Sequence, residues 1–190
     1  VTENKTKKKI DGEIYIRTKN VRKLIAEIAF KIHKIIPKNL IAVTGTNGKS
    51  SIANFYYQIL RLNKKKVASI GTLGVKSDKI NHNLPNTTVD PLYLGQILKK
   101  LKNSKIDNVI MEASSHGLKQ HRLDGLQFST GIFTNLSQDH IDYHKNFRNY
   151  FKAKLYLFEK LIKPRGSVIT DNKIPEFKKI KSVSKKRGLS

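Results

Sequence analysis

Cysteine is absent from this 190-residue sequence. Its absence excludes disulfide bonds, thiolate zinc sites and a cysteine nucleophile, and it is compatible with a reducing compartment. The sequence also lacks any run of about 18 apolar residues, so it predicts no membrane span. The first ten residues are basic, but no apolar stretch follows them, so they do not resemble a secretory signal.

Acidic residues are scarce. The chain has 14 Asp and Glu against 38 Lys and Arg, a formal net charge of +24. Such an excess is typical of proteins that bind nucleic acids or anionic substrates. The lysines are spread along the whole chain, and no zinc finger or aromatic-interleaved basic repeat is present. We therefore attribute most of the charge to a Lys-, Asn- and Ile-rich composition, with some benefit for an anionic substrate.

Short apolar segments alternate with segments of helical periodicity, which predicts an α/β fold: a P-loop-type, mostly parallel sheet with helices on both faces. A charged lead-in over residues 1–19 contains one strand-like piece, 13–17. The expected strands are 40–43, 67–71, 108–113, 130–136 and 166–170, and the expected helices are 21–36, 50–62, 90–101, 147–162 and a last one from 175. Asn20 and Asp90 are the expected N-caps, and Pro37 is expected to end the first helix.

The stretches with chemically useful side chains all follow expected strands. They are TGTNGKSS (44–51), EASSHGLKQHR (112–122) and TNLSQDHIDYH (134–144). Ligands of parallel α/β sheets bind at the carboxyl ends of the strands, so these three stretches should converge on one edge.

The first stretch has the features of a phosphate-binding loop between a strand and a helix. Gly45 and Gly48 allow a tight turn, Lys49 can contact the β- and γ-phosphates, and Ser50 can bind Mg²⁺. However, Val43 occupies the position where the common motif has its outer glycine. From these residues alone, a glycine-containing turn with a chance lysine stays open as an alternative.

TGTNGKSS resembles the ATP loop of the Mur ligases, which build the peptide stem of the bacterial cell wall and do not need the outer glycine. MEASSHGLKQHRLDG, NTT at 86–88, TNLSQDHIDYH and YFKAK resemble the corresponding segments of one branch, the UDP-N-acetylmuramoyl-tripeptide synthetases. These motifs occur in the family's order over roughly residues 38–172. The resemblance implies the central domain of such a ligase.

The resemblance also implies roles for individual residues. Those expected to bind ATP are Gly45, Thr46, Asn47, Gly48, Lys49, Ser50 and Ser51. Those expected to bind the UDP-linked substrate are Asn86, Thr87, Thr88, Ser114, Gln120 and Arg122. Those expected to hold Mg²⁺ are Ser50, Glu112, His140 and Lys154, the last as a lysine carbamylated by CO₂. Lys49, His140 and carbamylated Lys154 are the expected catalytic residues.

Four of the six histidines lie between residues 116 and 144, so a zinc site is an alternative to consider. His140 and His144 have the spacing of two ligands on one helix face. The segment DHIDYH is more typical of a loop, however, and no HExxH motif is present. We expect His116 and His144 to orient their neighbours. Ser115 and His116 are not a hydrolase pair, because adjacent side chains diverge and no GxSxG motif occurs.

The expected domains are a tail of an N-terminal UDP-substrate domain with a linker (1–37) and an incomplete central ATP-binding domain (38–190), with the C-terminal ligase domain missing. The implied function is that of an ATP- and Mg²⁺-dependent amide ligase. It would add diaminopimelate or lysine to UDP-N-acetylmuramoyl-L-alanyl-D-glutamate through an acyl phosphate, in peptidoglycan synthesis. We expect a monomer in the bacterial cytoplasm, and an inactive fragment when this piece is alone. The alternatives are another Mur-type or folylpolyglutamate-type ligase and, in a different class, a basic nucleic-acid-binding P-loop protein.

Overall fold

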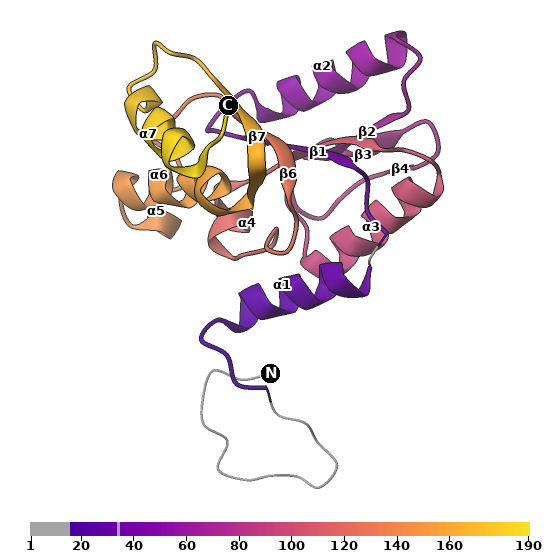
Figure 1. Ribbon diagram of the computed structural model, residues 1–190, viewed down its shortest axis with the longest axis horizontal. Coiled ribbons are helices and arrows are strands. Elements are labelled where there is room, and N and C mark those ends of the chain that lie inside the picture. The colour runs from indigo at the N-terminus through magenta and orange to yellow at the C-terminus, as the bar shows by residue number, and fades with distance from the viewer. Residues whose placement is uncertain (1–15, 34) are drawn as a thin grey trace, which may run out of the picture.

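The computed structural model describes residues 16–33 and 35–190 and contains one seven-stranded sheet of order β4-β3-β2-β5-β1-β6-β7 (Figure 1). The strands are β1 (Asn39–Thr44), β2 (Val67–Gly71), β3 (Gly74–Ser77), β4 (Asn81–His82), β5 (Asn108–Glu112), β6 (Phe128–Phe133) and β7 (Ile162–Thr170). The helices are α1 (Val21–Ile32), α2 (Lys49–Leu62), α3 (Pro91–Asn103), α4 (Ser115–Lys119), α5 (Ile141–His144), α6 (Phe147–Tyr156), a π-helical turn η1 (Leu157–Leu161) and α7 (Phe177–Arg187).

Strands β2, β5, β1, β6 and β7 are parallel, whereas β3 and β4 extend the β2 edge as an antiparallel hairpin. Helix α2 lies on one face of the sheet, and α1 and α3 lie on the other (Figure 1). The predicted α/β fold with a mostly parallel sheet and helices on both faces is therefore confirmed.

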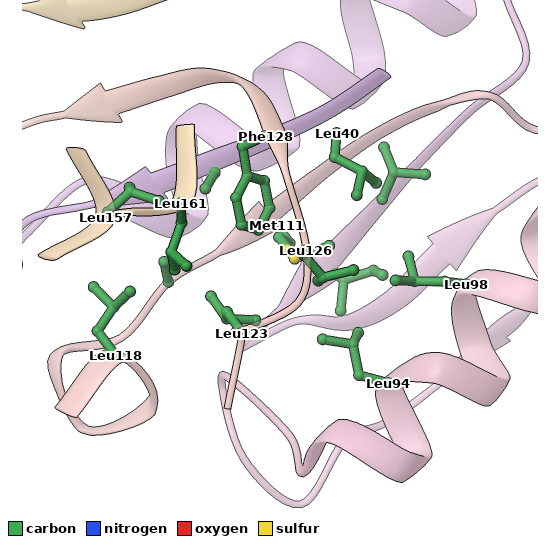
Figure 2. Packing of buried hydrophobic residues seen from close by; sticks show 14 of the residues in the cluster. Leu40, Leu94, Leu98, Met111, Leu118, Leu123, Leu126, Phe128, Leu157 and Leu161 are labelled. Carbon is green, nitrogen blue, oxygen red and sulfur yellow. The ribbon is translucent and has the colours of Figure 1, made fainter. Parts of the chain in front are cut away.

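The larger hydrophobic core lies between the sheet and the helices of the α3 face. It includes Leu94 and Leu98 of α3, Met111 of β5 and Phe128 of β6, all at most 2% exposed (Figure 2). A smaller cluster of Val43, Ala53 and Ile110 packs under α2. Because both faces of the central strands are covered, their polar groups can reach a ligand only at the strand ends.

Both predicted helix N-caps are confirmed. The side chain of Asn20 accepts a hydrogen bond from the Lys23 amide at 3.0 Å, and that of Asp90 accepts one from the Tyr93 amide at 3.0 Å. Each cap satisfies an amide that has no partner within its own helix. Pro91 then occupies the first helical position, where a missing N–H costs nothing.

Several predicted boundaries are wrong. The first helix ends at Ile32, before Pro37, with His33 as its C-cap. Ile32 and Ile35 are 66% and 49% exposed, so these two side chains gain little from burial. The helix predicted to reach residue 162 ends at Tyr156 and continues as η1; Ile162 already pairs with Phe128, so β7 starts four residues before the predicted strand.

The strand expected over 130–136 instead covers Phe128–Phe133, since the chain beyond it turns toward the loop after β1. The segment DHIDYH contains the short helix α5 and is not simply a loop. The sequence did not predict α4, β3 or β4. Most of the strand-like piece at 13–17 lies outside the described residues.

Candidate functional site

The ends of β1, β5 and β6 lie side by side and bring the three predicted stretches together. Val43 pairs with Glu112 on one side and with Ile132 on the other. A cavity of about 130 Å³ opens there. Its lining includes seven predicted site residues, Lys49, Ser50, Thr87, Glu112, Ser114, His140 and Lys154, and three that sequence reasoning missed, Thr72, Ser115 and Tyr150.

The loop between β1 and α2 has the predicted tight turn. Gly45 has φ +145°, and a Cβ there would lie 1.8 Å from the Thr134 hydroxyl, so no side chain fits. Gly48 has φ +82° and is the N-cap of α2. Val43 is fully buried in β1 and takes no part in the turn, so the missing outer glycine leaves the loop geometry intact.

The loop is held in place by the segment that follows β6. The Thr46 amide donates to the Asn135 carbonyl at 2.9 Å, and the Asn47 amide donates to the Asn135 side chain at 3.0 Å. The Thr134 hydroxyl donates to the Asn47 carbonyl at 2.7 Å. The motif TNL had marked this segment, but sequence alone did not show that Thr134 and Asn135 fix the loop.

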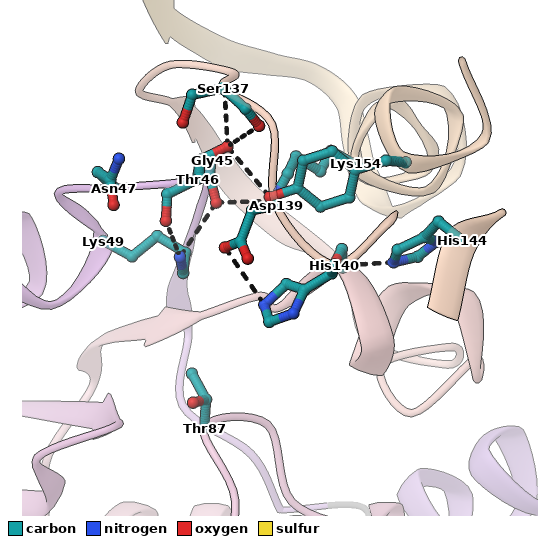
Figure 3. A network of polar contacts seen from close by, with 12 residues as sticks. Gly45, Thr46, Asn47, Lys49, Thr87, Ser137, Asp139, His140, His144 and Lys154 are labelled. Carbon is teal, nitrogen blue, oxygen red and sulfur yellow. Dashed lines mark hydrogen bonds and ion pairs between the residues drawn. The ribbon is translucent and has the colours of Figure 1, made fainter. Parts of the chain in front are cut away.

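Lys49 lies on the inner side of the loop. Its Nζ donates to the carbonyls of Gly45 and Thr46 at 3.0 and 2.7 Å (Figure 3). Desolvation by burial lowers the pKa of Lys49, while the negative charges of Glu112 and Asp139 act in the opposite direction. The ammonium is therefore already oriented toward the space enclosed by the loop.

Glu112, at the end of β5, is 2% exposed. Its carboxylate accepts hydrogen bonds from the Ser50 hydroxyl at 3.0 Å and from the Thr72 amide and hydroxyl at 2.9 and 3.2 Å. A carboxylate and a hydroxyl in contact form the oxygen-donor pair that Mg²⁺ prefers. Thr72 orients this carboxylate, a role that no sequence motif indicated.

Lys154 lies on α6 and is 1% exposed. Its Nζ donates to the Gly45 carbonyl at 2.6 Å and lies 4.3 Å from the centre of the Tyr150 ring. Burial, together with the nearby charge of Lys49, lowers the pKa of Lys154 to about 7. The Tyr150 hydroxyl lies 3.0 Å from the Thr46 hydroxyl, so α6 contacts the loop between β1 and α2 through both Tyr150 and Lys154.

His140 precedes α5 with φ +53°, and its ring nitrogen lies 3.4 Å from the Asp139 carboxylate. His116 packs against both His140 and His144, at ring-centroid distances of 4.8 and 5.5 Å. His144 is buried and its Nε2 lies 3.1 Å from the Ser115 hydroxyl; burial and the neighbouring positive charges lower its pKa to about 4, so it is neutral near pH 7.

The geometry gives the zinc alternative no support. Within residues 16–33 and 35–190, no three His, Cys, Asp or Glu side chains gather closely enough to hold a metal ion by themselves. The four predicted Mg²⁺ ligands differ in how well they suit a cation. Ser50 and Glu112 are in contact and His140 faces the same cavity, while the Lys154 ammonium repels a cation unless it is converted into an oxygen donor.

The predicted substrate residues divide into groups. Thr87 and Ser114 line the cavity beside Glu112, whereas Gln120 and Arg122 line a separate cavity. Thr88 is buried; its hydroxyl donates to the Glu112 carbonyl at 2.9 Å and accepts from the Ser114 amide at 3.0 Å, so it supports the backbone. Asn86 is exposed, as is Ser51, which was predicted to bind ATP, and neither side chain makes a hydrogen bond to another described residue.

Among the described residues, no helix combines the length and apolarity needed to cross a membrane.

The fold and this site define an α/β domain with a glycine-containing loop between β1 and α2 that is held by the segment after β6 and by α6. The family described as the Mur ligase middle domain matches residues 43–190. The chain belongs to the Mur ligase family.

A UDP-N-acetylmuramoyl-L-alanyl-D-glutamate–2,6-diaminopimelate ligase of Zymomonas mobilis is 40% identical over 181 residues, which cover 95% of this chain and 37% of that protein. A solved structure with the same ligase name superposes with a TM-score of 0.79 at 28% identity, over 90% of this chain and 35% of that one. A Mycobacterium tuberculosis folylpolyglutamate synthase complexed with ADP has a TM-score of 0.67 at 12% identity, over 89% and 45%, and shows the shared fold alone. The chain thus spans little more than a third of the length of the curated relative.

Proposed function

We propose that this chain is the ATP-binding part of an ATP- and Mg²⁺-dependent ligase that joins 2,6-diaminopimelate to UDP-N-acetylmuramoyl-L-alanyl-D-glutamate in peptidoglycan synthesis. The main support is the convergence of the phosphate loop, Glu112 with Ser50, and buried Lys154 on one cavity. The choice of diaminopimelate over lysine rests on the names of the relatives. We also propose that residues 38–190 belong to the central domain and that residues 1–37 connect it to an N-terminal substrate domain.

The proposed reaction has two steps. A carboxylate oxygen of the acceptor's D-glutamate attacks the γ-phosphorus of ATP, ADP leaves, and an acyl phosphate forms. The amine of the diamino acid then attacks the acyl carbon, loses a proton and displaces phosphate. Two anions must approach in the first step, so the protein's task is positioning and charge stabilisation.

The residues of the cavity suit that task. The backbone amides of the loop and the start of α2 can bind the phosphates, and the Lys49 ammonium can leave the Gly45 and Thr46 carbonyls for the β- and γ-phosphates. Mg²⁺ held by Ser50, Glu112 and His140 would neutralise charge on the transferred phosphoryl group. Thr72 keeps the Glu112 carboxylate oriented toward Ser50.

Lys154 suits carbamylation because its pKa of about 7 leaves much of the amine neutral at physiological pH. The neutral nitrogen attacks CO₂ and loses a proton, and a carboxylate replaces the cation. This reaction removes a positive charge from beside Lys49 and adds an oxygen ligand to the cavity. The proposal includes a monomeric enzyme in the bacterial cytoplasm.

The test uses the full-length protein and measures ADP release. We expect ADP release to depend on both the acceptor and diaminopimelate. It should be abolished in Lys49→Ala. It should be retained in the control Lys65→Ala, which removes an exposed lysine just beyond α2. Unchanged turnover in Lys49→Ala would contradict the proposal. Release driven by a folate and glutamate would favour a folylpolyglutamate-type ligase, and release stimulated by nucleic acid would favour the basic P-loop alternative.

A further inference from the structure

A second cavity, of about 230 Å³, lies between α1 and the segment after α4. Five residues line it: Arg22, Ile25, Pro91, Gln120 and Arg122. Gln120 and Arg122 come from one of the predicted substrate segments. Arg22 and Ile25 come from α1, a helix for which the sequence suggested no role in binding.

The cavity is tied to the candidate active site through hydrogen bonds. Arg122 donates through Nη1 to the Thr88 carbonyl, and the Thr88 hydroxyl donates to the Glu112 carbonyl at 2.9 Å. Gln120 donates to the Tyr143 hydroxyl at 3.1 Å, and the Tyr143 ring packs against His116 and His144 at centroid distances of 4.1 and 4.9 Å. A ligand group bound in the second cavity would therefore have a fixed position relative to Glu112.

The charges around this cavity are unbalanced. Two arginines line it, and none of the five lining residues is acidic. Arg122 is oriented by Thr88 and by the Gln120 side chain, which accepts from its Nε at 3.0 Å. Arg22 is exposed and makes no hydrogen bond or ion pair with another described residue. An anion between the two guanidinium groups would relieve their repulsion and satisfy their free N–H donors.

The position of Arg22 in α1 gives a second reason. It lies in the first turn of α1, and no acidic residue is present in that turn. A cation at this end of a helix is unfavourable because the helix dipole is positive there. The helix dipole therefore does not favour Arg22 at this position, whereas an anionic ligand would be favoured by both the side chain and the helix N-terminus.

We propose that Arg22 is a substrate-binding residue that, together with Arg122, holds an anionic group of the acceptor, a carboxylate or a phosphate. This assignment rests on the proposed function, because the acceptor of that reaction has both kinds of group. Ile25 and Pro91 supply an apolar wall beside the anion. The guanidinium of Arg22 can bind two oxygens at once, which an ammonium cannot do with the same geometry.

The experiment measures binding of UDP-N-acetylmuramoyl-L-alanyl-D-glutamate to the full-length protein by calorimetry. Arg22→Gln should weaken binding by about 10- to 100-fold, the loss typical of a hydrogen-bonded charged group, with ATP affinity and melting temperature unchanged. Arg22→Lys should be intermediate. Lys31→Gln, which removes the same charge from an exposed position in the last turn of α1, is the control and should bind normally.

Two further ligands distinguish the sources of the anion. If Arg22 binds a phosphate, Arg22→Gln should weaken binding of UDP alone by the same factor. If it binds the α-carboxylate of D-glutamate, an acceptor amidated at that carboxylate should bind the wild type weakly, and Arg22→Gln should cause no further loss. Two results would overturn the assignment of Arg22 but leave the proposed function standing. In the first, the wild type binds the acceptor and Arg22→Gln binds it within twofold of the wild-type affinity. In the second, Lys31→Gln loses as much affinity as Arg22→Gln. Absence of acceptor binding to the wild type would overturn the proposed function as well.

Discussion

Carbamylation of Lys154 is the prediction that depends most on the structure. An ordinary lysine with a pKa of about 10.4 is neutral in roughly one molecule per thousand at about pH 7.5. With its pKa lowered to about 7 by burial, Lys154 is neutral in roughly three quarters of molecules at that pH. Since only the neutral amine attacks CO₂, the structure predicts an enhancement of several hundredfold in the reactive form of Lys154.

The amount of carbamate on Lys154 should increase with pH. As pH rises through about 7, the Lys154 ammonium loses its proton. At a constant bicarbonate concentration the neutral amine and bicarbonate give the carbamate and water with no net release of a proton, so the carbamate should rise over the same range as the neutral amine. The assay is ¹³C NMR of the full-length protein in ¹³C-bicarbonate, with ADP release measured on the same samples. The wild type should show a carbamate signal that rises with a midpoint near pH 7.

Two variants on α6 make the assay specific. Lys154→Ala should lose both the carbamate signal and turnover, and short carboxylates such as acetate should restore part of the turnover. Lys152→Ala, which removes an exposed lysine two residues away, should keep both. A midpoint near pH 10, an undiminished signal in Lys154→Ala, or full activity of that variant without added carboxylate would refute the reasoning.

Three other substitutions test the rest of the site. Gly45→Ala should abolish binding of a fluorescent ATP analogue, because its Cβ would overlap the Thr134 hydroxyl at φ +145°; retained binding would show that the loop is misplaced. Tyr150→Phe removes the hydroxyl contact with Thr46 and should raise KM for ATP by about 2- to 12-fold with kcat little changed, whereas an unchanged KM would exclude a role in positioning the loop. Glu112→Gln should raise the Mg²⁺ concentration needed for half-maximal turnover by about 10- to 100-fold. If that concentration does not change, Glu112 is not a Mg²⁺ ligand.

The arrangement of the sheet could be predicted because its signals are local. Alternating apolar strands and capped helices, such as those beginning after Asn20 and Asp90, gave the fold class. From that class it followed that the three polar stretches meet at one edge. The hairpin β3–β4 was not predicted because its strands have only four and two residues, which is too short for a periodic pattern.

Individual contacts at the site could not be predicted, because they depend on which way each side chain points. Thr88 lies in a predicted substrate motif, yet its hydroxyl is buried against the backbone of Glu112 and Ser114. Tyr150 was noted as a motif residue, but its contact with Thr46 joins segments that are far apart in sequence. Arg22 gave no motif signal at all, and only the packing of α1 brings it to the cavity shared with Arg122.

The central claim is that this site activates a carboxylate as an acyl phosphate. The most direct measurement uses UDP-N-acetylmuramoyl-L-alanyl-D-glutamate labelled with ¹⁸O in the D-glutamate γ-carboxylate, together with ATP, Mg²⁺, diaminopimelate and the full-length protein. Mass spectrometry of the released phosphate should show one ¹⁸O atom for each amide formed. Amide formation that leaves the phosphate unlabelled, or phosphate release without any amide product, would contradict the account.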